Sequence, residues 1–183
     1  MPTTPSSTST TSKPSGNDVM CDFEEDLADC FMSNSREDTT DFVRADQCLG
    51  STSPCYDHTS GYGYYLIFRP QVRNSYDRGT LVGPWLKFDS REICIGGYFH
   101  GAGSCSAHLI IQSFSSSDTD YHVSIPLTKA WGKEQLSFKT KGATFRVLIV
   151  AEVQNDSSAS VSVDDLYIRS GSCDGGSGSG SGF

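Results

Sequence analysis

The stretch Thr144-Phe-Arg-Val-Leu-Ile-Val-Ala-Glu-Val153 is the clearest indication of the fold. Its apolar side chains recur at every second position from Phe145 to Val153. Successive side chains of a β-strand point to opposite faces, so this period predicts a strand with one buried face. An amphipathic helix would instead repeat its apolar residues every three or four positions.

Other segments share this character, being short and rich in β-branched or aromatic residues. We expect strands at Tyr62–Phe68, Leu81–Phe88, Ile93–Phe99, His108–Phe114, Tyr121–Ile125, Gln135–Phe138 and Val161–Ile168. Turn-forming residues separate them, at Asn74-Ser75, Asp89-Ser90, Gly101–Ser104, Ser115–Asp118, Lys141-Gly142 and Asn155–Ser158. Short strands at this spacing predict an all-β fold, a two-sheet antiparallel β-sandwich of jelly-roll type.

The segment Glu24–Cys55 follows neither the strand period nor the helix period. A loop of this length inside a compact domain needs to be pinned. Cysteines lie at its edges and within it, at Cys21, Cys30, Cys48 and Cys55. We therefore expect one long N-terminal loop held by disulfide bonds.

The two ends of the chain have compositions that do not favour folding. Residues 1–18 are rich in Thr, Ser and Pro and are predicted to be a linker, either an O-glycosylated stalk or a bare flexible spacer. Residues 174–183 are a Gly/Ser-rich linker. One folded domain, residues 19–173, is expected between them.

Composition and charge restrict the setting and the partners. Seven cysteines among 183 residues, without paired CxxC spacings, indicate disulfides and an extracellular compartment. The formal charge of −8 disfavours a nucleic-acid partner. No apolar run approaches the roughly 18 residues that span a bilayer, so we expect no direct membrane insertion by this segment. Met1–Thr10 lacks the apolar core of a signal peptide, and we expect the export signal elsewhere in a longer parent protein.

Motifs of catalysis are missing from the sequence, which contains no HExxH, GxSxG or P-loop pattern. His100, Cys105 and His108 are close enough in sequence to suggest a metal site, but alternation along a strand need not bring them to one face. We favour surface histidines there. His58 follows Asp57, and a structural hydrogen bond is the interpretation we prefer to a catalytic dyad. The sequence predicts a non-catalytic domain.

Several short motifs occur in a recognisable order, and the most specific is Asp57-His58-Thr59 followed by Gly61, Gly63 and Tyr64. The others are Cys21-Asp22-Phe23-Glu24 with Cys30, Asp41-Phe42, Gly83-Pro84-Trp85-Leu86 with Cys94, Tyr98-Phe99-His100, Trp131, and Val161–Ile168 with Cys173. Together they resemble the MAM family of extracellular adhesion domains, over Cys21–Cys173. Val43 replaces a tryptophan usual in the family, and Cys48, Cys55 and Cys105 are additions to its cysteine framework.

The resemblance implies two disulfides, Cys21–Cys30 and Cys94–Cys173. Cys48 and Cys55 lie in one loop and pair most economically with each other, although other pairings remain open. An odd number of cysteines leaves one unpaired within a monomer, and Cys105 is our candidate for a free or interchain thiol. Exposure and burial of this thiol are both open.

Carboxylates suggest a cation site. Asp22 and Glu24 are two apart on an expected strand and would share a face. The resemblance brings Asp57 and the pair Asp164-Asp165 together and implies a bound cation. Hard oxygen ligands suit Ca²⁺, so we predict a structural calcium site from these residues, the alternative being a solvated acidic rim.

The leading functional expectation is an extracellular protein-interaction module that mediates adhesion or self-association, in a secreted protein or the ectodomain of a cell-surface protein. A homotypic contact would be covalent through Cys105 if that thiol is exposed, and noncovalent otherwise. One alternative is a carbohydrate-binding jelly roll that uses exposed aromatics, with candidates Tyr62, Tyr64, Tyr65 and Tyr98. Another is an accessory domain of a secreted protease. Asn155-Asp156-Ser157 is an N-glycosylation sequon in a predicted turn, or an ordinary polar turn.

Overall fold

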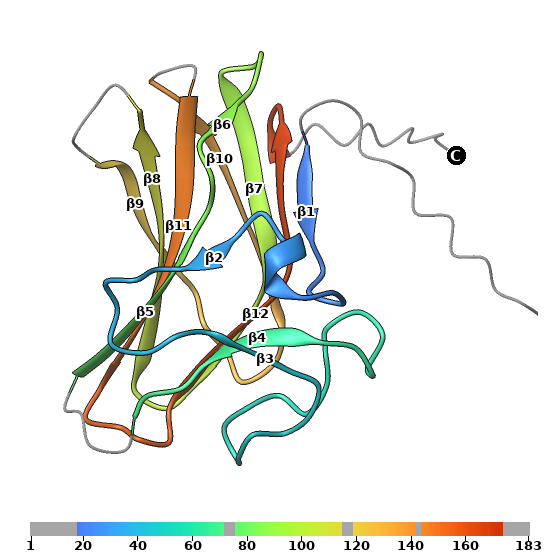
Figure 1. Cartoon of the computed structure of the whole chain (residues 1–183), viewed down its shortest axis with the longest axis vertical. Helices are drawn as coiled ribbons and strands as arrows, with labels where there is room; N and C mark the ends of the chain where they lie inside the picture. The colour runs from blue at the N-terminus through green and yellow to red at the C-terminus, as the bar shows by residue number, and fades with distance from the viewer. Residues whose placement is uncertain (1–17, 72–75, 115–118, 142–143, 174–183) are drawn as a thin grey trace, which may run out of the picture.

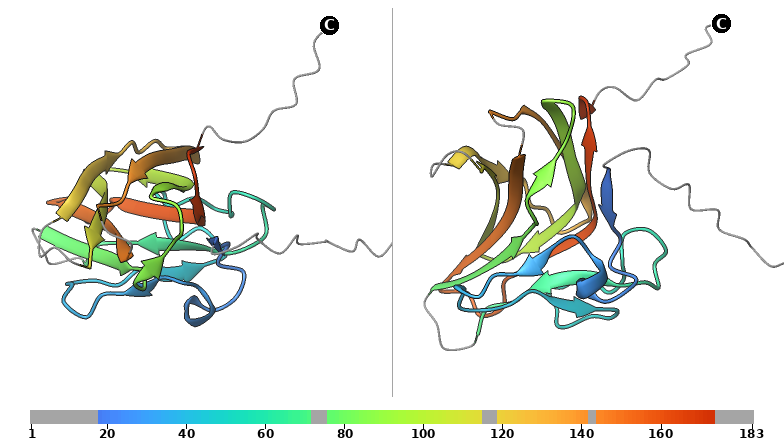
Figure 2. Two further views of the ribbon diagram at one scale, coloured as in Figure 1. Left: turned by 90° about the horizontal axis from the view of Figure 1, so that it is seen from above. Right: turned by 45° about the horizontal axis from the view of Figure 1, so that its top comes forward.

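The computed structural model describes residues 18–71, 76–114, 119–141 and 144–173, which form two antiparallel sheets facing each other (Figures 1 and 2). Sheet A has the strand order β10-β7-β12-β4-β3, and β1 pairs with β12. Its strands are β10 (Gly132–Lys139), β7 (Glu92–Ala102), β12 (Ser160–Ser170), β4 (Tyr65–Phe68), β3 (Val43–Ala45) and β1 (Val19–Cys21). The arrangement is half of the predicted sandwich.

Sheet B forms the second layer, with the order β2-β5-β11-β8-β9 and with β6 paired to β11. Its strands are β2 (Ser33–Asn34), β5 (Tyr76–Val82), β11 (Thr144–Gln154), β8 (Cys105–Ser113), β9 (Thr119–Ile125) and β6 (Leu86–Lys87). All recorded pairings in both sheets are antiparallel. The two layers together confirm the predicted β-sandwich.

The core lies between the sheets, and β11 contributes to it as its period predicts. Phe145, Val147 and Ile149 are each at most 1% exposed and belong to the main apolar cluster. The intervening Arg146 and Leu148 are only partly buried. Phe145 also packs against Phe138 from sheet A, with ring centroids 5.7 Å apart. Apolar burial of this kind is the main source of stability in the fold.

Two predicted strands are wrong in their extent. Tyr62–Phe68 begins too early, because β4 starts at Tyr65. Leu81–Phe88 is not continuous, because β5 ends at Val82 and β6 covers only Leu86–Lys87. Gly83 still donates its N–H to the carbonyl of Val147 at 2.8 Å, but Pro84 has no N–H to continue the ladder. The turns expected at Asn74-Ser75 and Ser115–Asp118 fall outside the described residues.

The long N-terminal loop contains more regular structure than expected. It includes the short strands β2 and β3 and one turn of 3₁₀ helix, η1 (Leu27–Asp29). The side-chain amide of Asn34 bonds both the N–H and the carbonyl of Phe42 at 2.9 Å, which links two parts of the loop. Strands of two or three residues are too short to show a period. Within the described ranges η1 is the one helical element, and no helix there could cross a membrane.

Disulfide bonds join Cys21 to Cys30, Cys48 to Cys55 and Cys94 to Cys173. These are the pairs expected above. The third bond ties β7 to the chain that follows β12, across 79 positions of sequence. The second closes a small loop, here called the Cys48–Cys55 loop, near a separate apolar cluster of Ala45, Tyr65 and Ile67 with Leu49 and Trp131.

Candidate functional site

Residues 57–64 form a turn before β4 that we call the acidic turn, because Asp57 organises it. Asp57 is 1% exposed. Its carboxylate accepts hydrogen bonds from the N–H groups of Ser60 (2.7 Å) and Gly63 (3.0 Å) and from the Ser60 hydroxyl (3.1 Å). Burial raises the pKa of Asp57, but the hydrogen bonds favour the ionised form and leave the pKa below its ordinary value. Asp57 therefore holds the turn as a charged group.

Asp164 lies beside the acidic turn, at a bulge where the register of β12 against β7 shifts. It is 1% exposed and accepts the N–H groups of His58 and Asp165, both at 2.8 Å. Burial raises the pKa of Asp164 to about 8; the His58 N–H opposes this shift, while the charges of Asp165 and Asp57 add to it. Asp164 therefore retains a proton at neutral pH unless a positive charge is near.

His58 connects the acidic turn to Asp165. Its Nδ1 lies 3.0 Å from the Asp165 carboxylate, which also accepts the Thr59 hydroxyl. The His58 ring stacks on Tyr98, with centroids 3.2 Å apart and planes 14° apart. The side-chain partner of His58 is thus Asp165 and not its neighbour Asp57, and its recorded contacts are structural.

Glu24 reaches the acidic turn, whereas Asp22 is recorded only in its own turn. The Glu24 carboxylate accepts the N–H of Tyr64 at 3.0 Å, and the Asp22 carboxylate accepts the N–H of Glu24 at 3.2 Å. The prediction that Asp22 and Glu24 share a strand face is wrong, since β1 ends before them. Phe23 between them has φ of 59° and is buried, which turns the chain.

The structure thus gathers Glu24, Asp57, Asp164 and Asp165 around residues 57–64. Their carboxylate oxygens accept hydrogen bonds from the protein. Within the described residues, no group of three or more His, Cys, Asp or Glu side chains is arranged to hold a metal ion. The calcium site remains a prediction.

The four tyrosines suggested as a sugar platform do not share one surface. Tyr65 is fully buried, so its assignment to an exposed platform is wrong. Tyr64 lies under the Arg44 guanidinium, 3.3 Å from its ring centre, and Tyr98 is covered by His58. Tyr62 alone is largely exposed. Strand alternation and the turn point these rings in different directions.

A pocket that the sequence did not suggest lies on the outer face of sheet A, beside the Cys48–Cys55 loop. Its volume is about 600 Å³, and it is lined by residues that include Tyr56, His100, Lys129 and Trp131. We call it the sheet A pocket. His100 is 6% exposed, so its expected surface position is wrong. The loop that covers this part of the strand could not be placed from the sequence.

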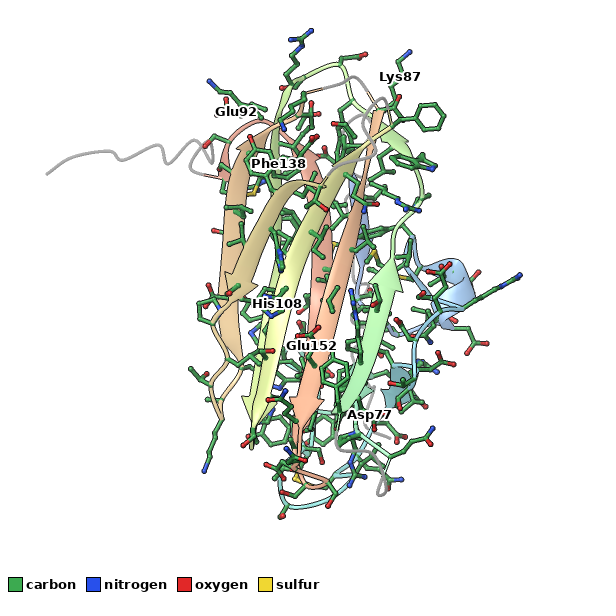
Figure 3. The ribbon with its side chains drawn as sticks, turned by 90° about the vertical axis from the view of Figure 1, so that its left-hand side faces the viewer. Asp77, Lys87, Glu92, His108, Phe138 and Glu152 are labelled. Atoms are coloured by element: carbon green, nitrogen blue, oxygen red, sulfur yellow. A yellow bond between two sulfur atoms is a disulfide. The ribbon has the colours of Figure 1, made fainter. Side chains whose placement is uncertain are left out.

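The outer face of sheet B is open and carries charged and polar side chains, among them His108 and Glu152 (Figure 3). His108 Nε2 lies 3.9 Å from the Glu152 carboxylate, which also accepts the Tyr76 hydroxyl at 2.7 Å. His100 and His108 therefore belong to different sheets and do not form a metal site with Cys105.

An exposed aromatic pair occupies one end of sheet B. The rings of Trp85 and Phe114 meet edge to face, with centroids 5.1 Å apart, and they are 42% and 69% exposed. The Arg146 guanidinium lies 4.7 Å from the Trp85 ring centre, while its Nε donates to Gln112 at 2.8 Å. We call Trp85, Phe114 and Arg146 the aromatic patch.

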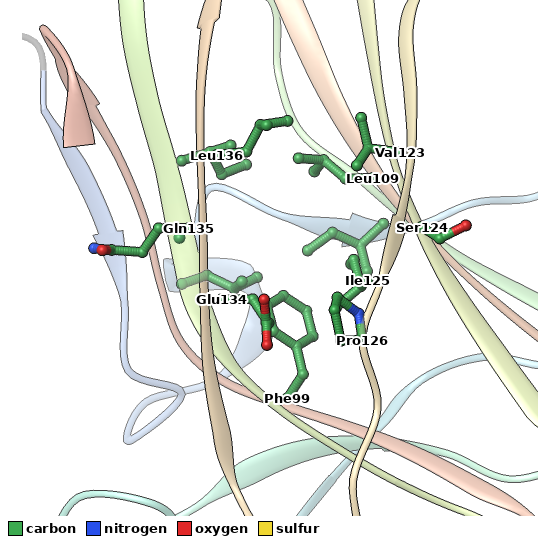
Figure 4. A pocket seen from close by; sticks show the side chains of 13 residues that line it. Phe99, Leu109, Val123, Ser124, Ile125, Pro126, Glu134, Gln135 and Leu136 are labelled. Carbon is green, nitrogen blue, oxygen red and sulfur yellow. The ribbon is translucent and has the colours of Figure 1, made fainter. Parts of the chain in front are cut away.

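A narrow cavity of about 90 Å³ opens between the sheets at the edge formed by β9 and β10. Leu109 and Val123 line it from sheet B, and Leu136 lines it from sheet A (Figure 4). Its volume is well below the 300 Å³ or more that is typical of ligand sites, so we regard it as a gap in packing.

Cys105 is the one free cysteine of the described residues and is partly buried. Its Sγ lies 3.4 Å from the carbonyl of Ser160, and burial raises the pKa of the thiol. Both features disfavour the thiolate that forms interchain bonds. Asn155 is exposed in the turn after β11, with φ of 51°, and its glycosylation remains a prediction.

Comparison with solved structures finds other proteins that share this fold. The chain is similar to the carbohydrate-binding module TmCBM61, solved in complex with β-1,4-galactotriose, at 12% identity over 76% of this chain and 87% of that one, with a TM-score of 0.54. It is similar to the K1 cleaved adhesin domain of Lys-gingipain from Porphyromonas gingivalis W83, at 12% identity over 86% and 100%, with a TM-score of 0.51. These likenesses show the fold alone.

A third similar structure is the CBM22-1–CBM22-2 tandem domain of Xyn10C from Paenibacillus barcinonensis, at 14% identity over 88% of this chain and 47% of that one, with a TM-score of 0.52. The family model of the MAM domain, meprin/A5/mu, matches residues 21–174. This family consists of non-catalytic extracellular modules, a setting that the three disulfides fit. Since the match covers most of the sequence, the chain belongs to the MAM domain family.

Proposed function

We propose that this domain is a non-catalytic protein-interaction module that mediates adhesion or self-association through the aromatic patch. The observation that carries the proposal is the exposure of Trp85 and Phe114 side by side on the surface. Exposed apolar groups that lie together mark interaction sites on soluble proteins. Trp and Arg are also the residue types that dominate binding energy at protein interfaces.

The surroundings of the aromatic patch suit a protein partner. Arg146 is held in place by Gln112 and by the Trp85 ring, so little side-chain entropy is lost when it binds. The open face of sheet B adjoins the patch and can supply a polar rim around it. A second copy of the domain is the partner that we test first, because adhesion modules act through many weak contacts.

The test compares the wild-type domain with the double variant Trp85→Ala/Phe114→Ala. Sedimentation equilibrium measures self-association, and clustering of beads coated with the domain measures adhesion. Loss of two central anchors should weaken self-association by roughly 30-fold or more, which corresponds to about 2 kcal/mol. Tyr62→Ala is the matched control, since Tyr62 is a 93% exposed aromatic outside the patch.

Two outcomes would count against this proposal. Equal association by the wild type and the double variant would remove the aromatic patch from the interface. A wild type that is strictly monomeric and does not cluster beads would refute self-association, and the partner would then be a different protein. Circular dichroism of the variant is the check that its fold is retained.

Carbohydrate binding is a second candidate function, favoured by the sheet A pocket. The pocket combines aromatic walls with polar groups and has the volume of a small-molecule site. TmCBM61, which shares the fold, was solved with a bound trisaccharide. A glycan array probed with the wild-type domain tests this function, and selective binding would support it.

A further inference from the structure

The outward-facing side chains of β11 carry opposite charges at their two ends. Arg146, Leu148, Val150 and Glu152 alternate with core-facing residues of the strand, so these four lie on the outer face of sheet B. Arg146 and Glu152 are six positions apart, which is about 20 Å along a strand. β11 therefore presents a positive group at one end of this face and a negative group at the other.

The positive end belongs to the aromatic patch. Arg146 donates from Nε to Gln112 and lies over the Trp85 ring, and it forms no ion pair with a carboxylate of the described residues. A guanidinium has five N–H donors, so most of them stay available for a carboxylate from another molecule. The charge of Arg146 is held in position and is not neutralised within the described part of the domain.

The negative end consists of Glu152, Tyr76 and Arg78, here called the Glu152 cluster. The Glu152 carboxylate accepts the Tyr76 hydroxyl at 2.7 Å and lies 4.0 Å from Nε of Arg78. Tyr76 is 43% exposed, and Arg78 is also exposed. The Glu152 cluster can therefore offer a carboxylate to a cation, and a ring and a guanidinium to aromatic side chains.

Apolar side chains lie between these two ends. Val82, Leu148 and Ile110 occupy one rung across β5, β11 and β8, and each is only partly buried. Covering them with a second sheet removes apolar surface from water and favours association. The formal charge of −8 makes two copies of the chain repel each other, so they need a face on which opposite charges are placed to meet.

A two-fold axis turns the pattern of β11 into two identical contacts. When two copies face each other with antiparallel β11 strands, Arg146 of each copy faces Glu152 of the other, and the axis passes between Leu148 and Val150. With parallel strands, Arg146 would face Arg146 and Glu152 would face Glu152. Like charges in contact are unfavourable, so charge selects the antiparallel arrangement.

We propose that two copies of this domain associate through the outer faces of sheet B, with the aromatic patch of each copy on the Glu152 cluster of the other. The inference rests on the proposed function, to which it adds the partner's surface and the orientation. The five strands in the order β2-β5-β11-β8-β9 span about 20 Å, similar to the length from Arg146 to Glu152. A face of this size belongs to the class of weak interfaces.

The experiment reverses the charges and measures self-association by sedimentation equilibrium at up to millimolar protein concentration. Arg146→Glu leaves acidic groups at both ends of β11, and Glu152→Arg leaves basic ones. Each variant should self-associate more weakly than the wild type by about tenfold or more. Lys133→Glu and Glu92→Arg reverse exposed charges on sheet A by the same amounts, and these matched controls should associate like the wild type.

A mixture of the two variants provides the sharpest test. Combining Arg146→Glu with Glu152→Arg in equal amounts brings opposite charges together again at both contacts, so the mixture should form a heterodimer more tightly than either variant forms a homodimer. The variant that carries both reversals should recover self-association for the same reason. Recovery also shows that loss of association in the single variants does not come from loss of the fold.

The other outcomes differ in what they overturn. Self-association that both single reversals leave at wild-type strength would overturn this arrangement but leave the aromatic patch as the proposed interface. Weakening by Arg146→Glu alone would keep the aromatic patch in the interface and overturn its placement on the Glu152 cluster. Weakening by both variants without recovery in the mixture would also overturn that placement. A wild type that stays monomeric at millimolar concentration would refute self-association itself.

Discussion

The outer faces of the two sheets differ in what lies on them. On sheet A, Tyr65, Ser160 and Ser162 are fully buried although they point away from the main core, because the N-terminal loops cover them. On sheet B, Arg78 and His122 remain exposed beside Glu152 and His108, which lie on the open face (Figure 3). The same strand alternation therefore yields a structural layer on one side and a surface open to partners on the other.

This difference changes the role of carboxylates. Asp164, below the loops of sheet A, is 1% exposed and lies beside two other carboxylates. Glu152, on sheet B, is partly exposed and contacts Tyr76, Arg78 and His108. A charge on the covered face affects stability strongly, while a charge on the open face is screened by water.

The largest expected effect comes from the two disulfides that hold sheet A and its cover. Cys94→Ala with Cys173→Ala should lower the free energy of unfolding by about 4.5 kcal/mol, and Cys48→Ala with Cys55→Ala by about 2.5 kcal/mol. The reason is the sequence separation, 79 positions against 7. Urea denaturation measures both values. A larger loss for the Cys48–Cys55 pair would mean that the cover contributes more than its loop closure.

Calcium binding is the second test, and it concerns the covered outer face of sheet A. If the carboxylates around the acidic turn bind Ca²⁺, saturation at about 100 times the Kd should stabilise the fold by about 2.7 kcal/mol, and EDTA should reverse this. Calorimetry of metal-free protein with and without added calcium measures the shift in melting temperature. Asp165→Asn should reduce the shift. An identical melting temperature in EDTA and in calcium would argue against the site.

The third test is the pH dependence of stability. The pKa of Asp164 is about 8 in the folded protein against 3.8 ordinarily, so between about pH 4 and pH 8 the folded state binds a proton that the unfolded state releases. The free energy of unfolding contributed by Asp164 should therefore fall as pH rises, by more than about 1 kcal/mol from pH 5 to pH 8. Urea denaturation in EDTA measures this slope.

Two variants compare the covered face of sheet A with the open face of sheet B in that experiment. Asp164→Asn should flatten the slope, because the group that titrates is gone. Glu152→Gln, on the open face, should leave the pH slope unchanged and change the free energy of unfolding by about 0.5 kcal/mol or less. A slope that persists in Asp164→Asn would assign the titration to another group.

The smallest expected effect concerns Cys105, at the start of β8. Because its thiol is partly buried and its pKa is raised, it should react slowly with a thiol reagent in the folded protein and fully in urea. Cys105→Ser should change the free energy of unfolding by about 1 kcal/mol or less. Rapid labelling of the folded domain, or a dimer band on non-reducing gels that Cys105→Ser abolishes, would show instead an accessible thiol.

Much of the fold could be predicted from local patterns. The period of Thr144–Val153 predicts its strand because burial of one face is a property of neighbouring residues, and the structure places β11 there. The short strands β2 and β3 could not be predicted in this way. They exist because β5 and β4 offer unpaired edges, and those edges belong to segments distant in sequence.

The candidate sites, like the fold, could be predicted from the sequence only in part. Resemblance in sequence order was enough to single out Asp57, Asp164 and Asp165 as residues that meet. It could not show that Glu24 joins them while Asp22 stays in its own turn, since that depends on the left-handed backbone of Phe23. Nor could it place His100 beneath the Cys48–Cys55 loop.

By itself, the sequence determined the layers of this protein: which strands have a buried face and which cysteines suit an extracellular domain. Those properties follow from composition and from the spacing of neighbours along the chain. The linkers expected at residues 1–18 and 174–183 remain a prediction, because residues 1–17 and 174–183 lie outside the described ranges. Only the tertiary structure decided which outer face is covered and which is open. That choice depends on contacts such as Tyr65 to Pro54 and Trp131 to Tyr56, whose partners are brought together by folding and not by the order of residues.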